Sequence, residues 1–564
     1  MDSWFFNPSL TSIFAVCLPL LAYVLYNCVR WTIAYRNSPL RDLPGPPWKN
    51  FFTGSHERHI WEPDAVHIQQ EWVAKYGAVF KYSSWFSVTK INVMDTKAVN
   101  HILTHVAEFE KPVEVRHVLG GILGKGLLFV EGAKHKQQRK VMSPAFGLPQ
   151  IRRFTNLFID KSIEVPIHIA SFPLYQRWVQ MRDILTSEIP HTPRGDGKLE
   201  IDVFAWMNKL TLDIIGLAGF NHPFQALHMD KPHELSEGVR GALNFDPFKM
   251  SFFLPVAIPP LRLVPTQRAR HLKKTSAFVN VFGRQLIAER KREILASAEV
   301  DKKGGVEKRK IQGNDLLSLL IKANMASDIP DSQRMSDEDI LAQVPTFLIA
   351  GHETTSTSIA WTLVALHTHP TVHAKLNAEV RAFATATPTM DELNALPYLD
   401  NVAREVLRLY APVGNTERIA TEDTVVPLGQ PFVDRQGNRR FEYAARKGDK
   451  FLIPIRAINR SKELWGEDAE EFRPERWDNV PESVQAIPSV YSNILTFIAG
   501  AHACIGYRFS VVEMKAILFT FVRSFNFELA VPQEEVLMYT RIVGRPTLRS
   551  APGVPQLPLR IWPA

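Results

Sequence analysis

The chain has 564 residues, of which 45% are apolar and 22% charged, as in an ordinary globular protein. Its formal net charge is +8, but the basic residues are dispersed among acidic ones and no nucleic-acid motif appears, which argues against a nucleic-acid partner. A basic face that docks an acidic protein or an anionic membrane explains this charge better. The only cysteines are Cys17, Cys28 and Cys504, too few for a disulfide framework, so we expect folding in a reducing compartment.

Residues 1–30 are predicted to be a membrane anchor, with the span at about residues 10–29. This run is apolar and nearly uncharged, and it reaches the roughly 20 residues that a helix needs to cross a bilayer. A cleaved signal peptide is the alternative, but no Lys or Arg precedes the run and no small-residue cleavage site follows it. Arginines after the span predict a single pass with the rest of the chain in the cytosol. Residues 31–47 are basic and proline-rich and predict a stiff hinge, followed by one domain over residues 48–564.

The first part of this domain predicts a helix from Ala65, then short strands at Val79–Tyr82 and Ile91–Met94. Residues 116–130 contain four glycines and predict an irregular connector. A polar helix is expected over Glu131–Val141, with His135 and Arg139 four residues apart on one face.

Two segments predict loops. Residues 251–265 are apolar and broken by prolines, and either dip into the membrane surface or form a buried connector. Residues 298–313 are rich in lysine and glycine and predict a solvated loop.

The second half predicts a long helix from Ser336, an N-cap residue, to about His367, with a bend at Pro345. Another helix is expected over Tyr398–Tyr410, and a small β-region over residues 425–453. The predicted fold class is therefore mainly α with a minor β region.

The long helix carries the polar motif AGHETTS at residues 350–356, inside an otherwise apolar stretch. Buried polar groups are costly unless they are satisfied or used, and Gly351 costs about 1 kcal/mol relative to alanine in a helix. These breaks in the pattern indicate a functional site, where Gly351 leaves room for a ligand and Glu353 supplies protons. A solvated helix kink is the alternative interpretation.

Glu405 and Arg408 lie three residues apart on the second helix, and Arg476 lies in a proline-fixed turn further along. The first two alone form a common surface pair, worth tenths of a kcal/mol. A buried carboxylate held by both arginines would instead be a structural lock.

The segment FIAGAHACIG at residues 497–506 contains Cys504, the only cysteine outside the first 28 residues. A lone cysteine is inert core filler, a nucleophile or a metal ligand. Gly500 and Gly506 allow close backbone approaches, which favours a thiolate loop held against a large flat cofactor.

Taken in order, these motifs resemble the cytochrome P-450 family of haem-thiolate monooxygenases, in the membrane-anchored eukaryotic form and with a fungal style of sequence. The resemblance covers almost the whole chain, and the motif around Cys504 is highly specific. It implies the cytochrome P-450 fold, a large helical domain with a smaller β-rich part.

The resemblance also implies a role for each candidate residue. Cys504 would be the axial ligand of a haem b iron, and Thr354 and Glu353 would deliver protons on the opposite side. Glu405, Arg408 and Arg476 would form the structural triad. The residues expected to contact the haem are His135, Arg139, Arg418, Phe497, Gly500, His502 and Gly506. His135 replaces a tryptophan that many members have, although imidazole can still bond a haem carboxylate.

The implied reaction inserts one oxygen atom from O2 into a hydrophobic small molecule, by hydroxylation or epoxidation. Electrons would come from NADPH through a cytochrome P-450 reductase or a cytochrome b-type donor, with the enzyme in the endoplasmic reticulum membrane. The pocket would be lined by residues 113–128, 220–265 and those around Val413, and a terpenoid or polyketide of secondary metabolism would suit it. The alternatives are a haem-thiolate isomerase or dehydratase that acts on peroxides, and a non-catalytic haem sensor or carrier.

Overall fold

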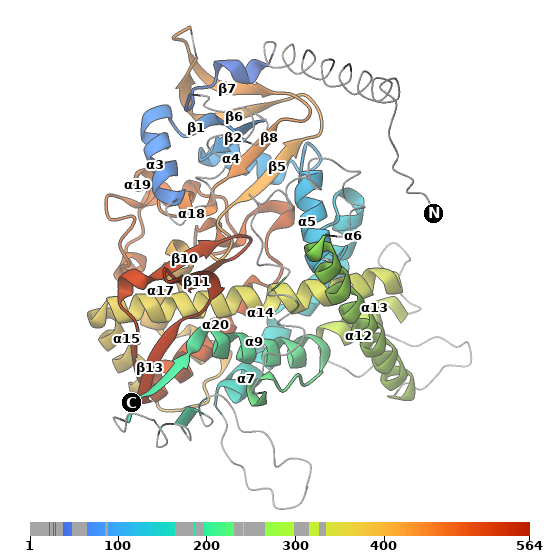
Figure 1. Cartoon of the computed structure of the whole chain (residues 1–564), viewed down its shortest axis with the longest axis vertical. Coiled ribbons are helices and arrows are strands. Elements are labelled where there is room, and N and C mark those ends of the chain that lie inside the picture. The colour runs from blue at the N-terminus through green and yellow to red at the C-terminus, as the bar shows by residue number, and fades with distance from the viewer. Residues whose placement is uncertain are drawn as a thin grey trace, which may run out of the picture.

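The computed structural model describes residues 38–47, 65–84, 88–163, 197–229, 266–297, 315–325, 334–434 and 436–564, with a few isolated positions between them. The predicted span at residues 10–29 lies outside this part of the chain except for three single residues. The predicted loops at residues 251–265 and 298–313 lie outside it altogether. The described residues form a large helical part and, toward the top of Figure 1, a smaller part rich in strands.

The α-helices make up most of the regular structure and confirm the predicted fold class. Their bounds are α3 (Ala65–Tyr76), α4 (Thr96–Thr104), α5 (Val113–Leu123), α6 (Gly132–Met142), α7 (Leu148–Ser162), α9 (Val203–Phe220), α12 (Gln267–Ser297), α13 (Leu316–Met325), α14 (Asp337–Thr368), α15 (Pro370–Ala382), α16 (Met390–Asn394), α17 (Pro397–Leu409), α18 (Ile455–Ile458), α19 (Lys462–Trp465) and α20 (Tyr507–Ser524).

The strands form four small sheets in the described part of the chain. The largest has the order β1 (Val79–Ser83), β2 (Thr89–Val93), β8 (Lys450–Ile453), β5 (Thr416–Ala420) and β3 (Phe109–Glu110). The others are β10 (Val536–Thr540) with β11 (Gly544–Leu548) and β12 (Ala551–Pro555); β4 (Leu199–Asp202) with β13 (Pro558–Pro563) and β9 (Phe525–Leu529); and the hairpin of β6 (Thr424–Val433) and β7 (Arg439–Ala445). The predicted β-region and the two early strands are confirmed.

Helix α14 runs through the middle of the molecule (Figure 1), and it confirms the predicted long helix. Ser336 caps it as predicted, because its hydroxyl accepts from the Asp339 amide at 3.1 Å while the Asp339 carboxylate accepts from the Ser336 amide. The helix continues through Pro345 to Thr368. Helix α9 packs along it, and α17 and α20 also contact it. This arrangement surrounds the AGHETTS motif with protein.

Helix α9 is also the helix in the described part of the chain that is long and apolar enough to cross a membrane. Most of it is buried against the rest of the protein, as in a core helix. It therefore gives no support to the predicted N-terminal anchor, which is a different segment.

The prediction of an irregular connector over residues 116–130 is wrong in its first half, because α5 extends to Leu123 and includes Gly120 and Gly121. A Cβ at Gly120 would lie 2.7 Å from the ring of Phe129, so this glycine lets the following segment fold back onto the helix. Gly124, with φ +74°, ends the helix. Tertiary packing thus outweighs the low helix propensity of glycine here.

Candidate active site

The cysteine loop is built from two short 3-10 turns, Leu495–Phe497 and Gly500–His502, and leads into α20. The Cys504 amide donates to the Phe497 carbonyl at 2.8 Å, which closes the loop. Ile498 has φ +57°, a costly conformation for a β-branched residue and one that often marks a functional site. The ring of Phe497 packs edge-on against Tyr491, with the ring centroids 5.7 Å apart. The loop is thus held rigidly in a strained shape.

Cys504 has exposed surface, yet burial raises the pKa of its thiol, while the Gly506 amide and the Arg139 charge lower it. The side chain therefore has protein around it but is not covered completely. A thiol in that position is accessible to a ligand, and the amide and the guanidinium favour its ionised form. This arrangement argues against inert core filler.

The two loop glycines have different surroundings. Gly500 has φ +70°, and a Cβ there would lie 2.2 Å from the carbonyl oxygen of Leu103, so this glycine lets the loop pack on α4. The contact explains the glycine without a cofactor. A Cβ at Gly506 would meet only Phe146, at 3.7 Å. What Gly506 supplies is the amide that favours the Cys504 thiolate.

Helix α14 has one accessible patch in its buried middle. From Gln343 to Leu366 every residue is buried except Ala350, Gly351 and Thr354, which share one face of the helix. The Thr354 hydroxyl donates to the Ala350 carbonyl at 2.8 Å and keeps its acceptor lone pairs. An accessible face in the middle of a core helix is where a ligand can be placed.

Gly351 owes its place to a neighbouring helix. A Cβ at this position would lie 2.8 Å from the Ile215 side chain of α9. The interpretation that Gly351 leaves room for a cofactor is therefore wrong, because Ile215 takes that space and the glycine allows α9 to approach α14.

Glu353 is buried, and its Oε2 lies 2.9 Å from Nη2 of Arg545 on β11, which is also buried. The Nδ1–H of His352, beside it, donates to the Leu348 carbonyl, and this side chain has no exposed surface. Sequence reasoning missed Arg545, because nothing near this residue in the sequence marks it. The indole of Trp361 on α14 donates to the Gly544 carbonyl at 2.8 Å, which fixes β11 beside the motif.

The predicted basic residues lie in the elements next to the cysteine loop. Arg139 on α6 donates to the Ala503 carbonyl, directly before Cys504. Arg418 on β5 is 1% exposed and donates to Thr416 Oγ1 and the Glu417 carbonyl, both at 2.8 Å. Its Nε has no hydrogen-bond partner among the described residues, and burial lowers its pKa to about 10. A buried guanidinium with an unused donor suits an anionic ligand group.

The rings of His135 and His502 contact each other at a tilt of 41°, with centroids 4.0 Å apart, and so hold α6 against the cysteine loop. Burial, together with the nearby His502 and Lys111, lowers the pKa of His135 to about 3, so this ring is neutral at pH 7. His502 also contacts Glu131 and Lys111. Sequence reasoning missed these two residues, because only the folded chain brings them together.

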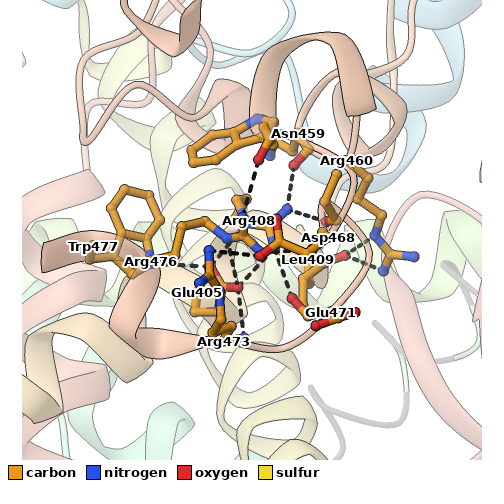
Figure 2. A network of polar contacts seen from close by, with 12 residues as sticks. Glu405, Arg408, Leu409, Asn459, Arg460, Asp468, Glu471, Arg473, Arg476 and Trp477 are labelled. Carbon is orange, nitrogen blue, oxygen red and sulfur yellow. Dashed lines mark hydrogen bonds and ion pairs between the residues drawn. The ribbon is translucent and has the colours of Figure 1, made fainter. Parts of the chain in front are cut away.

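The three residues of the predicted triad lie together (Figure 2) and are fully buried. Glu405 accepts from Arg408 Nη2 at 2.8 Å and Nε at 2.9 Å, and from Arg476 Nε at 3.4 Å. It also accepts from the Arg473 amide at 3.0 Å and the Trp477 indole at 3.1 Å. The arginines in turn donate to carbonyls of the following segment, so this network fastens α17 to residues 459–477.

A mainly helical fold with a strained cysteine loop and a polar patch in a long core helix is the arrangement expected of the haem-thiolate class of proteins. The sequence profile of the cytochrome P-450 family matches residues 44–550, and the chain belongs to that family. It is 46% identical to cytochrome P-450 monooxygenase 205 of Postia placenta over 96% of both chains. It is 44% identical to monooxygenase 128 of the same fungus, over 94% of both chains. It is also 33% identical to cytochrome P-450 monooxygenase claU of Ampulloclitocybe clavipes, over 93% of this chain and 94% of that one.

The chain is therefore a cytochrome P-450 monooxygenase, and its family implies a haem cofactor. The residues present fit that group. Cys504 is an accessible sulfur donor, while the buried Arg418 and the half-buried Arg139 are cations suited to the haem carboxylates. Members of the class act on small molecules with O2 and a redox partner.

Proposed function

We propose that this enzyme inserts one oxygen atom from O2 into a hydrophobic small molecule, by hydroxylation or epoxidation, with NADPH-derived electrons from a reductase. The observation that carries the proposal is the accessible face of α14 at Ala350, Gly351 and Thr354, in a stretch of helix that is otherwise buried from Gln343 to Leu366. A haem with a thiolate ligand supplies O2 activation when it is bound. The polar groups next to this face supply protons.

Cys504 is the residue that would hold the haem iron, through its sulfur. The Gly506 amide and the Arg139 guanidinium favour the thiolate against the cost of burial. Phe497, Gly500 and the remaining loop residues hold the sulfur in place. Arg139 and Arg418, with His135 and His502 beside them, are the proposed partners of the haem carboxylates.

Thr354 and Glu353 are the proposed proton relay. The Thr354 hydroxyl can accept one proton while it donates another, and it lies on the accessible face. The Glu353 carboxylate is one residue away, beside Arg545. This pair favours an oxygenase over a peroxide isomerase or a haem sensor, because neither of those needs protons delivered to O2.

The substrate and the cellular setting follow from the sequence. Apolar segments around α5 and after α9 suit a hydrophobic molecule of low charge, and we propose a terpenoid or polyketide of secondary metabolism. Residues 10–29 are the proposed anchor in the endoplasmic reticulum membrane, with the catalytic domain in the cytosol.

The experiment is O2 uptake by the haem-loaded protein with NADPH and a fungal P-450 reductase, across a library of hydrophobic compounds. We expect uptake that depends on the compound, together with an oxygenated product by mass spectrometry. Rapid rearrangement of organic peroxides without O2 uptake would replace the proposal by an isomerase. Haem binding with neither reaction would replace it by a sensor.

A further inference from the structure

Three buried side chains meet between the cysteine loop and α6. Glu131 Oε1 lies 2.9 Å from Nζ of Lys111, and Glu131 Oε2 lies 2.9 Å from Nε2 of His502. Lys111 Nζ is also 3.1 Å from His502 Nδ1. The exposed fractions of these side chains are 4% for Glu131, 5% for His502 and 10% for Lys111. The contacts join the β3–α5 connection, the start of α6 and the cysteine loop.

Helix capping does not explain the carboxylate of Glu131. This residue is the N-cap of α6, but its side chain makes no capping hydrogen bond. It turns instead toward Lys111 and His502. Burial would raise the pKa of Glu131, but the bond to His502 and the charge of Lys111 outweigh burial and lower it to about 2. The cluster therefore contains a fixed negative charge.

This negative charge lies among the cations that suit the haem carboxylates. It acts on Arg418 as well as on Lys111, since it raises the pKa of both groups against the effect of burial. Lys111 has three N–H donors, and Glu131 uses one of them. Glu131 thus orients Lys111 while it offsets part of the positive charge around it.

We propose that Glu131 is a positioning residue for the haem: a permanent internal anion that orients Lys111 beside the haem carboxylates and favours the ferric state of the iron. The inference rests on the proposed function, because it requires that the haem is bound at Cys504. A negative charge close to the haem opposes the arrival of an electron, and the low dielectric of a buried site strengthens the effect.

The test measures the ferric/ferrous reduction potential and the rate of haem loss to apomyoglobin, neither of which needs a substrate. Glu131→Gln keeps the size of the side chain and removes its charge. We expect the ferrous-to-ferric ratio at a fixed applied potential to rise by up to tenfold, equivalent to about 59 mV for one electron. The glutamine oxygen can still accept from Lys111 and so retain its orientation, and haem loss should slow because the haem carboxylates meet more net positive charge.

Two further variants give controls. Glu114→Gln removes a carboxylate that pairs with Lys450 at 3.1 Å and is 44% exposed, and should leave the potential unchanged. Lys111→Met should lower the potential and speed haem loss. The double variant Lys111→Met, Glu131→Gln removes both charges of the pair, so it leaves neither of them buried without a partner and should return the potential toward the wild-type value.

The outcomes separate the two proposals. If Glu131→Gln left the reduction potential unchanged but lost haem faster, the inference would be overturned. Glu131 would then be a structural contact only. Equal shifts in Glu131→Gln and Glu114→Gln would overturn it too, since a general charge effect would then suffice. If the wild-type protein bound no haem, or bound it without a thiolate ligand, the proposed function itself would be refuted.

Discussion

Replacement of Glu405 by glutamine tests whether the network in Figure 2 is a structural lock. The carboxylate accepts from five donors: two on Arg408, one on Arg476, the Arg473 amide and the Trp477 indole. Its Oε1 serves three of them and its Oε2 serves two. A glutamine has one acceptor oxygen, so in either orientation its amide N–H groups face at least two of these donors.

Glu405→Gln therefore leaves the buried guanidinium of Arg408 without its counter-charge, while Arg476 keeps its ion pair with Asp468. Removal of one partner from a buried ion pair costs about 3–5 kcal/mol. This is a large part of the 5–15 kcal/mol that typically stabilises a folded domain. We expect a markedly lower apparent melting temperature and much less folded, haem-loaded protein on expression.

The assay is thermal unfolding followed by circular dichroism, with haem content measured by absorbance. The control is Glu467→Gln, because Glu467 pairs with Lys462 at 3.3 Å in the same region but is 91% exposed. An exposed pair contributes about 0–1 kcal/mol, so this variant should behave as the wild type. If both variants lost the same small amount of stability, the structural role of Glu405 would be refuted.

Three further substitutions test other parts of the site. Thr354→Ala should leave haem binding intact, because the hydroxyl makes only one hydrogen bond, within its own helix. Without the proposed relay hydroxyl, electrons should go to hydrogen peroxide instead of product. Turnover in which every electron still reached product would contradict the relay. Arg545→Met leaves Glu353 buried without its cation and should lower the free energy of unfolding, measured by chemical denaturation, by about 3 kcal/mol or more. Arg545→Lys keeps a cation and should retain most of the wild-type stability. If the two variants were equally stable, the charge pair would be dispensable. Gly500→Ala should cost about 1–2 kcal/mol for the left-handed backbone, plus the clash with Leu103, and should reduce haem content. Gly506→Ala is the control, because its added Cβ would make only an ordinary contact with Phe146. If this variant lost as much haem as Gly500→Ala, the close packing of Gly500 against α4 would not explain the loss.

Local sequence signals predicted much of the fold. The cap at Ser336, the apolar periodicity after it and the strand pattern of residues 425–453 each depend on neighbours in the chain, so α14 and a small β-region could be expected. The polar motif of α14 was noticeable because polar residues are rare in a buried helix. These signals need no knowledge of the tertiary structure.

The contacts that the sequence could not predict depend on distant segments. Arg545 reaches Glu353 only because β11 packs on α14, and Lys111 meets Glu131 and His502 only where three segments converge. The glycines were misread for the same reason. At Gly351 the space is taken by Ile215, and Gly120 of α5 is tolerated because Phe129 packs against it.

The central claim is that Cys504 is the thiolate ligand of a haem iron, and the most direct measurement is the absorption spectrum of the reduced protein with carbon monoxide. The wild-type protein should give the red-shifted band that a thiolate ligand produces. Cys504→Ser, which replaces one sulfur atom by oxygen, should lack that band even where haem remains bound. If Cys504→Ser retained the band, the ligand assignment and the proposed oxygenase chemistry would both be contradicted.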